Sequence, residues 1–238
     1  MIITIALLSI LSSPLAAQES CVACHKTLHQ TTTLHHNFKD WETSAHGKAA
    51  VACQLCHGGN PNSAAKEGAH TGILPASDAK SPVYFTNIPR TCGNCHAAEL
   101  NAFKLSLHFK ELERTGRGPN CVTCHGSMAN RVIEPRDMEQ TCRLCHRKPT
   151  QAYAARLSVE EARAALRLLD GEISEAKAGG KMETAGAEKS YRDLAERTRA
   201  ALVEWHSFKT ADVFQKARAV AQEASAAYTK LRLKNRKP

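Results

Sequence analysis

The pattern of apolar and polar positions changes twice along the 238-residue chain. Residues 2–11 form an uninterrupted run of apolar and small side chains, and beyond residue 150 apolar side chains recur every three or four positions. A recurrence of this period is typical of amphipathic helices. It gives three apolar stripes: Ala162, Leu166, Leu169 and Ile173; then Tyr191, Leu194, Thr198, Ala201 or Leu202, and Trp205; then Val213, Ala217, Val220, Ala224 and Leu231. We therefore expect three helices in residues 151–238, each of about 16 to 22 residues.

Local signals suggest where these helices begin and end. Ser158 and Glu161 have the spacing of a capping box, which predicts that the first helix begins near Ser158. Gly179-Gly180 predicts its end. We expect the three helices to pack on one another and on the preceding part of the chain. The alternative is a separate oligomerisation domain of long coiled rods.

The apolar run at the N-terminus is followed by small residues up to Ala17 and by polar residues from Gln18 onward. This order predicts a signal peptide over residues 1–17, although no Lys or Arg precedes the apolar run. The run is shorter than the roughly 20 apolar residues of a membrane span, so an uncleaved anchor is the less favoured alternative. The mature protein is therefore expected to be periplasmic or extracellular.

The pattern Cys-x-x-Cys-His occurs five times and includes all ten cysteines of the chain. The copies are Cys21-Val-Ala-Cys24-His25, Cys53-Gln-Leu-Cys56-His57, Cys92-Gly-Asn-Cys95-His96, Cys121-Val-Thr-Cys124-His125 and Cys142-Arg-Leu-Cys145-His146. Two thiols at this spacing can each form a thioether with a haem vinyl group, and the adjacent histidine then ligates the iron. The motifs predict five covalently bound c-type haems, with the five motif histidines as proximal iron ligands.

Three other uses of cysteine fit the pattern less well. Zinc sites bring four ligands together at paired spacings, and a redox dithiol needs only one Cys-x-x-Cys. A disulfide framework explains ten cysteines but not a histidine after every second one. We therefore interpret residues 18–150 as a five-haem cytochrome c domain.

Composition adds two expectations about residues 18–150. Only 5% of the residues are aromatic, and between Cys21 and His146 each haem has about 25 residues to itself, so the porphyrins must serve as the core. We expect loops and short helices there, and a fold that is mainly α overall. The formal charge of +9 is offset by the haem propionates, which makes the holoprotein nearly neutral and argues against a nucleic-acid partner.

A repeated unit indicates which histidines lie on the distal side of the haems. Trp41-x-x-Ser44-x-His46 precedes the second motif, and Phe103-x-x-Ser106-x-His108 precedes the fourth. Twelve histidines less the five in motifs leave seven candidates for five irons. The distal ligands predicted from the repeat and from this count are His46, His108, His70, His206, and one of His35 or His36. His29 is a poorer candidate, because it lies on the same helix face as His25.

These motifs resemble a known superfamily of multihaem cytochromes. The unit from Trp41 to Gly59 is similar to the tetrahaem electron-transfer cytochromes of ammonia oxidisers, and the third and fourth motifs are similar to cytochrome c nitrite reductase and hydroxylamine oxidoreductase. The resemblance implies that His206 supplies a distal ligand from an aromatic-His turn before the last long helix. The chain departs from the nitrite reductases because it has no Cys-x-x-Cys-Lys motif, and no tyrosine is marked as the cross-link of hydroxylamine oxidoreductase.

The leading hypothesis is an electron-transfer protein with five bis-His haems, whose redox partners are other cytochromes or a quinol oxidoreductase. The first alternative is a reductase or oxidoreductase of small nitrogen or sulfur compounds with one open haem. The second is a subunit of an extracellular cytochrome filament, which would make the protein a homo-oligomer. Saturation of every iron by two imidazoles favours the carrier, because it keeps substrate off the metal.

Overall fold

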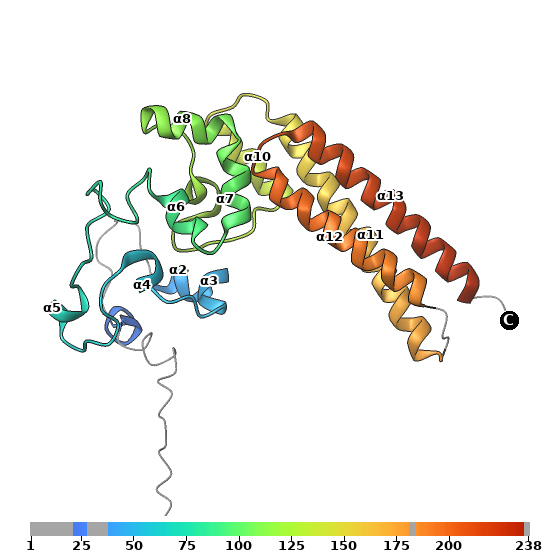
Figure 1. Ribbon diagram of the computed structural model, residues 1–238, viewed down its shortest axis with the longest axis horizontal. Helices are drawn as coiled ribbons and strands as arrows, with labels where there is room; N and C mark the ends of the chain where they lie inside the picture. The colour runs from blue at the N-terminus through green and yellow to red at the C-terminus, as the bar shows by residue number, and fades with distance from the viewer. Residues whose placement is uncertain (1–20, 28–37, 181–183, 236–238) are drawn as a thin grey trace, which may run out of the picture. The chain divides into compact units, whose positions relative to one another are not determined.

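The computed structural model describes residues 21–27, 38–180 and 184–235, and within these ranges the chain is mainly helical with no strand (Figure 1). The expected signal peptide and His29, His35 and His36 lie outside the described residues. Residues 21–25 are helical. The further helices are α2 (Phe38–Thr43), α3 (Ala45–Lys48), α4 (Gln54–His57), α5 (Lys66–Ala69), α6 (Ile88–Gly93), α7 (Ala97–Lys104), α8 (Leu107–Thr115), α9 (Cys121–His125), α10 (Pro135–Arg143), α11 (Thr150–Ala178), α12 (Ala185–Trp205) and α13 (Thr210–Asn235). The prediction of a mainly α fold is confirmed for the part of the chain that the structure describes.

The three long helices α11, α12 and α13 lie side by side and form a bundle (Figure 1). The three stripes predicted from the sequence face one another inside it, and most of their buried members belong to three hydrophobic clusters. Leu169, Val213 and Val220 are each no more than 1% exposed. The prediction of three helices with these apolar faces is therefore confirmed, but the expected length of 16 to 22 residues holds only for α12, with 21 residues, because α11 has 29 and α13 has 26.

The predicted start of the first long helix is wrong. Helix α11 begins at Thr150, directly after Pro149, and Ser158 is buried inside it, with its hydroxyl donating to the carbonyl oxygen of Ala155 at 2.8 Å. The apolar stripe continues upstream through Ala155 and Val159, both 0% exposed, which pack in one cluster with residues of α13. This burial outweighs the local capping signal, because most helix stability in proteins comes from packing an apolar face.

Helix α11 also buries a charge. The side chain of Arg156 is 4% exposed, and its Nη1 donates to Oε1 of Glu160, which also accepts from Nη1 of Arg163 at 3.0 Å. Burial opposes ionisation of Glu160, but the hydrogen bond and charge of Arg156, helped by Arg163, outweigh it and lower the pKa of this carboxyl. The ion pair with Glu160 therefore offsets the free-energy cost of burying the Arg156 cation.

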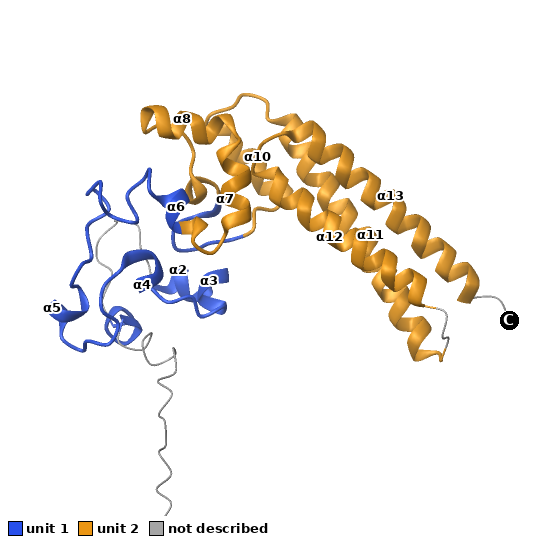
Figure 2. Cartoon of the chain, in the orientation of Figure 1, with its two compact units in different colours: residues 1–91, 125–131 blue, residues 92–124, 132–238 orange. Residues whose placement is uncertain are grey.

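The chain divides into two compact units (Figure 2). Unit 1 comprises residues 1–91 and 125–131, and unit 2 comprises residues 92–124 and 132–238. In unit 2, α7 packs against α12 and α10 packs against α11, so the helical bundle is continuous with the segments that carry the third and fifth motifs.

Unit 1 has no buried apolar core among its described residues. The side chains buried there are those of Ser44, Ser81 and Pro89, whereas every buried hydrophobic residue of the described chain lies at or beyond Phe103. Short helices α2 to α5 are joined by loops. In the longer loop between α5 and α6, Asn87 Nδ2 donates to the carbonyl oxygens of Ala79 and Ser81 at 2.8 and 2.9 Å. Polypeptide of this kind needs another source of apolar contact to be stable.

None of the helices within the described ranges has the length and apolar character required to cross a membrane.

Candidate metal centres

Each Cys-x-x-Cys-His motif forms a single helical turn. In the second, third and fifth motifs the histidine N–H donates to the carbonyl oxygen of the first cysteine, at 3.0, 2.9 and 2.8 Å respectively. The fourth motif is helix α9, and the first lies in the helical residues 21–25. A helical turn puts side chains three residues apart on one face, so the two thiols of each motif point to the same side. None of the ten cysteines is joined in a disulfide.

The repeated aromatic-Ser-His unit has the same backbone role in both copies. Ser44 caps the N-terminus of α3, with Oγ accepting from the Gly47 N–H, and Ser106 caps α8, with Oγ accepting from the Phe109 N–H, at 3.0 Å in each case. Each serine therefore places a histidine at the second position of its helix; these are His46 and His108.

His108 lies beside the motif histidine His146 in unit 2. Their Nε2 atoms are 3.5 Å apart and their ring centroids 5.7 Å apart. The ring of Phe208, from the turn between α12 and α13, meets His108 edge-on at 4.3 Å between centroids. Burial, and then the nearby charge of His146, lower the pKa of His108. The neutral imidazole of His108, which is the form that ligates a metal, is therefore favoured.

In unit 1 the motif histidine His25 lies beside His70. Their ring centroids are 6.1 Å apart, with 45° between the ring planes. His70 follows α5 in an irregular loop, and its side chain is exposed. The two histidines lie 45 positions apart in sequence (70 minus 25), so their proximity is a product of the fold.

The spacing of both pairs fits a metal held between two imidazoles. A metal–imidazole bond is about 2.0 Å long, so two axial imidazoles on one iron place their coordinating nitrogens about 4 Å apart and their ring centres farther. The 3.5 Å between Nε2 atoms and the 5.7 and 6.1 Å between centroids are close to this arrangement. Each pair joins one motif histidine to one histidine predicted as distal, which is the combination that bis-His ligation requires.

Three backbone contacts decide which ring nitrogen is available to a metal. Nδ1 of His70 lies 2.7 Å from the carbonyl oxygen of Lys66. Nδ1 of His125 lies 2.9 Å from the carbonyl oxygen of Arg131, and Nδ1 of His206 lies 3.1 Å from that of Leu202. A carbonyl oxygen only accepts, so Nδ1 must carry the proton and Nε2 the lone pair. Metal-ligating histidines have this kind of outer hydrogen bond almost without exception.

His46 also has a hydrogen-bond acceptor at Nδ1, but here the acceptor is a side chain that the sequence did not predict. Its Nδ1 lies 2.8 Å from Oδ1 of Asn130, 84 positions away. No local pattern marks Asn130, because its partner lies near the other end of the cysteine-rich region.

His206 lies at the C-terminal end of α12, beside a cavity of ≈ 890 Å³ in unit 2. The cavity is lined by α7, through Ala98, Ala102 and Leu105, and by α12 and the residues after it, through Ala200, Val203 and Ser207. The motif histidine His96 directly precedes α7, and the predicted distal histidine His206 directly precedes Ser207. Each histidine is therefore next in sequence to a segment that lines the cavity. Pockets for small molecules and cofactors have volumes of roughly 300–1,000 Å³.

Cysteines of successive motifs also lie close together. Cys92 and Cys121 share a hydrogen bond that raises the pKa of Cys92 and lowers that of Cys121. Burial, and then the neighbouring charges of Cys142 and Cys145, raise the pKa of Cys124 to about 11. In unit 1, burial and then the charge of Cys21 raise the pKa of Cys53. The attachment points of motifs one and two, three and four, and four and five are therefore neighbours.

Large apolar side chains are exposed around the motifs. Leu144, within the fifth motif, is 76% exposed, and Leu55, within the second, is 59% exposed. Leu105 and Leu107, on either side of the Ser106 cap, are 63% and 79% exposed. Apolar surface gathered at the motif turns, together with the absence of an apolar core in unit 1, fits a chain whose apolar contacts come from a bound cofactor.

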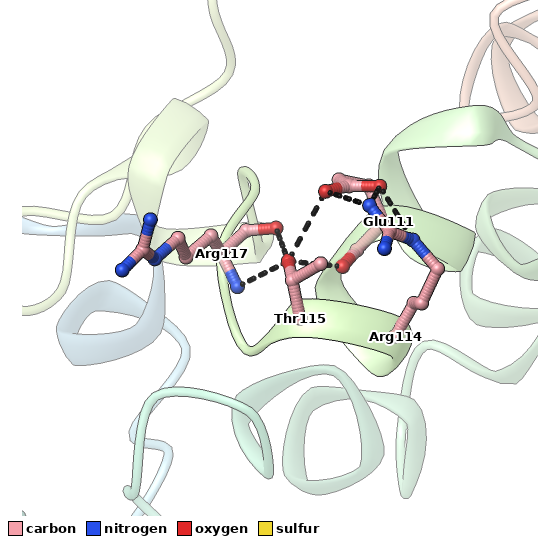
Figure 3. Close-up of polar contacts among 4 residues, drawn as sticks. All are labelled: Glu111, Arg114, Thr115 and Arg117. Carbon is pink, nitrogen blue, oxygen red and sulfur yellow. Dashed lines mark hydrogen bonds and ion pairs between the residues drawn. The ribbon is translucent and has the colours of Figure 1, made fainter.

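The C-terminal end of α8 leads the chain toward the fourth motif (Figure 3). Thr115 Oγ1 lies 2.8 Å from the carbonyl oxygen of Glu111 and accepts the N–H of Arg117 at 3.1 Å, while Arg114 forms a two-point ion pair with Glu111. The hydrogen bond from Arg114 lowers the pKa of Glu111. This network fixes the turn that starts at Gly116, whose φ of 69° suits glycine.

The arrangement differs from a cage of protein ligands around a bare ion. Within the described ranges, no three His, Cys, Asp or Glu side chains are grouped to hold a metal. A haem iron needs only two protein ligands, since the porphyrin supplies the other four. The histidine pairs therefore suit an iron porphyrin better than a zinc ion, which takes four protein ligands.

Comparison with protein-family models, with curated proteins and with solved structures returned no match.

Proposed function

We propose that the protein is a c-type multihaem cytochrome that binds five haems. The observation that carries this proposal is the pairing of motif histidines with predicted distal histidines, His25 with His70 and His108 with His146, at spacings that fit two axial ligands of one iron. Thioethers from the ten cysteines would hold the haems. The proximal ligands would be the five motif histidines. The distal ligands would be His46, His70, His108, His206 and one of His35 or His36.

Within this class we propose that the protein is an electron carrier. Covalently bound haem supplies a one-electron couple between ferric and ferrous iron when it is attached. The chain contributes two imidazoles to each site, which keep other ligands off the metal and favour a low potential. The outer hydrogen bonds of His46, His70, His125 and His206 hold these imidazoles in one tautomer and one orientation, so little rearrangement accompanies a change of charge.

The closeness of successive motifs supports a relay of single electrons along the chain. Cys92 and Cys121 are in hydrogen-bond contact, and Cys124 lies within electrostatic range of Cys142 and Cys145. Haems attached at such neighbouring points would lie near one another. The partners would be other cytochromes or a quinol oxidoreductase, in the periplasm or outside the cell, as the expected signal peptide and the superfamily resemblance imply.

One experiment separates this proposal from a reductase with an open haem. The purified secreted protein is examined by EPR and optical absorption in the ferric and ferrous states, before and after addition of carbon monoxide, nitrite and hydroxylamine. A carrier shows five low-spin haems that bind none of the three. A high-spin haem that takes up one of them would contradict the carrier and support the reductase, whereas polymers of the purified protein would support a filament subunit.

A further inference from the structure

The distal candidate His46 is held by a network centred on one side chain, that of Asn130. Oδ1 of Asn130 lies 2.8 Å from Nδ1 of His46, and Nδ2 of Asn130 donates to the carbonyl oxygen of Gly126 at 2.6 Å. The backbone carbonyl of Asn130 accepts the N–H of Ala45 at 3.2 Å. All of these residues belong to unit 1, and His46 and Asn130 are half-buried.

The network leaves only one assignment of protons. Gly126 offers a carbonyl oxygen, which accepts and never donates, so the amide NH₂ of Asn130 must face it. The amide oxygen then faces His46, and Nδ1 of His46 must carry the proton. Nε2 of His46 is therefore the nitrogen with the lone pair, which is the form that ligates a metal.

The acceptor for His46 differs from those of the other histidines with an Nδ1 contact. His70, His125 and His206 donate to backbone carbonyls, which no substitution removes. Among the Nδ1 contacts within the described ranges, that of His46 has a side-chain oxygen as acceptor. Its strength can therefore be changed by mutation.

We propose that Asn130 is a positioning residue that orients His46 as an iron ligand and sets the potential of the haem it serves. This inference rests on the proposed function. An acceptor at Nδ1 raises the electron-donating power of a ligating imidazole, and greater donation stabilises ferric over ferrous iron. Asn130 thus keeps this haem at a lower potential than an unsupported imidazole would.

The same loop also supports the fourth motif. His125 Nδ1 lies 2.9 Å from the carbonyl oxygen of Arg131, and the Arg131 N–H donates to the carbonyl oxygen of His125 at 3.1 Å. Gly126 has a φ of +83°, which favours glycine and allows the chain to turn back in this way. Residues 125–131 therefore fix a proximal ligand and, through Asn130, a distal ligand from α3.

Two substitutions at Asn130 separate a role through His46 from a role through the loop. Asn130→Ala removes both the acceptor for His46 and the donor to Gly126, whereas Asn130→Asp keeps and strengthens the acceptor but loses the donor. If Asn130 only shapes the loop, the two variants change the protein in the same way. If it acts through His46, they shift one haem potential in opposite directions.

The test is a potentiometric titration of the haem-loaded protein followed by optical absorption, with EPR g-values recorded for the ferric state. Asn130→Asp is expected to raise the ferric-to-ferrous ratio of one haem on the order of tenfold at fixed potential, which is about 59 mV for one electron. Asn130→Ala is expected to lower it. Asn87→Ala, which removes two loop hydrogen bonds in the same unit, is the matched control and should lower thermal stability with the potentials unchanged.

The contrary outcomes distinguish failure of the role of Asn130 from failure of the proposed function. Unchanged potentials and g-values in both Asn130 variants, with His46→Ala converting one haem to high spin, would overturn the role of Asn130 and leave the proposed function intact. Equal shifts in the two variants would assign Asn130 to the loop alone and overturn the inference as well. An unchanged spectrum in His46→Ala would remove His46 from the ligand set, and the proposal for Asn130 with it.

Discussion

Replacement of His108 tests the pairing with His146 through a change confined to one iron. The Nε2 atoms of the two histidines are 3.5 Å apart, and Phe208 packs edge-on against the His108 ring. His108→Ala removes the imidazole proposed as a distal ligand and keeps the Ser106 cap and the helix, because alanine is the best helix former. The local fold of α8 should therefore survive the substitution.

The expected size of the effect follows from the haem count. If His108 serves one of five haems, a fifth of the ferric EPR intensity should move from low spin to high spin. The ferrous variant should bind one equivalent of carbon monoxide per chain, because its iron has an open position, while the unmodified protein binds none. The potential of that haem should rise, since one strong donor to ferric iron has been lost.

The assay is quantitative EPR with carbon monoxide titration on protein whose haem content has been counted. Lys110→Ala is the matched control, because Lys110 lies on the same helix and is exposed. It should show neither change. Retention of five low-spin haems without carbon monoxide uptake in His108→Ala would refute the assignment of this histidine.

Three further predictions concern stability and folding. Ser106→Ala removes the acceptor for the Phe109 N–H and should lower the free energy of unfolding by about 1 kcal/mol, seen as a lower denaturant midpoint at unchanged slope. Glu160→Ala leaves the buried Arg156 charge without its carboxylate and should lower the free energy of unfolding by about 3 kcal/mol. This is the low end of the range for broken buried ion pairs, because Glu160 is 25% exposed. A double variant with Arg156→Leu should recover most of the lost stability. Because the pKa of Glu160 is lowered from its ordinary value of 4.5, its contribution is fully present above that pH and is lost as the pH falls through the folded pKa, so acid titration of stability should flatten in Glu160→Ala. In full-length chain produced without haem attachment, hydrogen exchange should be fast in residues 38–91 and slow in the long helices, and equal protection of both would contradict the haem-dependent core.

The helical bundle could be read from the sequence because its signal is local. The buried positions of α11 to α13 recur at helical spacing, and Leu169, Val213 and Val220 occupy the interior as predicted. The start of α11 could not be predicted, since Ser158 has the chemistry of a cap and only the packing of Ala155 and Val159 reveals that the helix continues past it.

The candidate metal centres could also be predicted only in part from the sequence. The repeat predicted His46 and His108, because the serine cap that positions each histidine is encoded within a few residues. The residue that each predicted distal histidine meets is not encoded in its local sequence. His25 meets His70 across a loop, and Asn130 reaches His46 from 84 positions away, so only the folded chain brings them together.

Covalent attachment of five haems is tested by counting bound haem in the purified secreted protein, by intact mass together with the pyridine haemochrome spectrum. We predict a mass increase of five haem groups on the chain and a spectrum in which both vinyl groups of every haem are saturated. A chain that carries no covalent haem when expressed with a working haem-attachment system, or one whose cysteines hold zinc instead, would contradict the account.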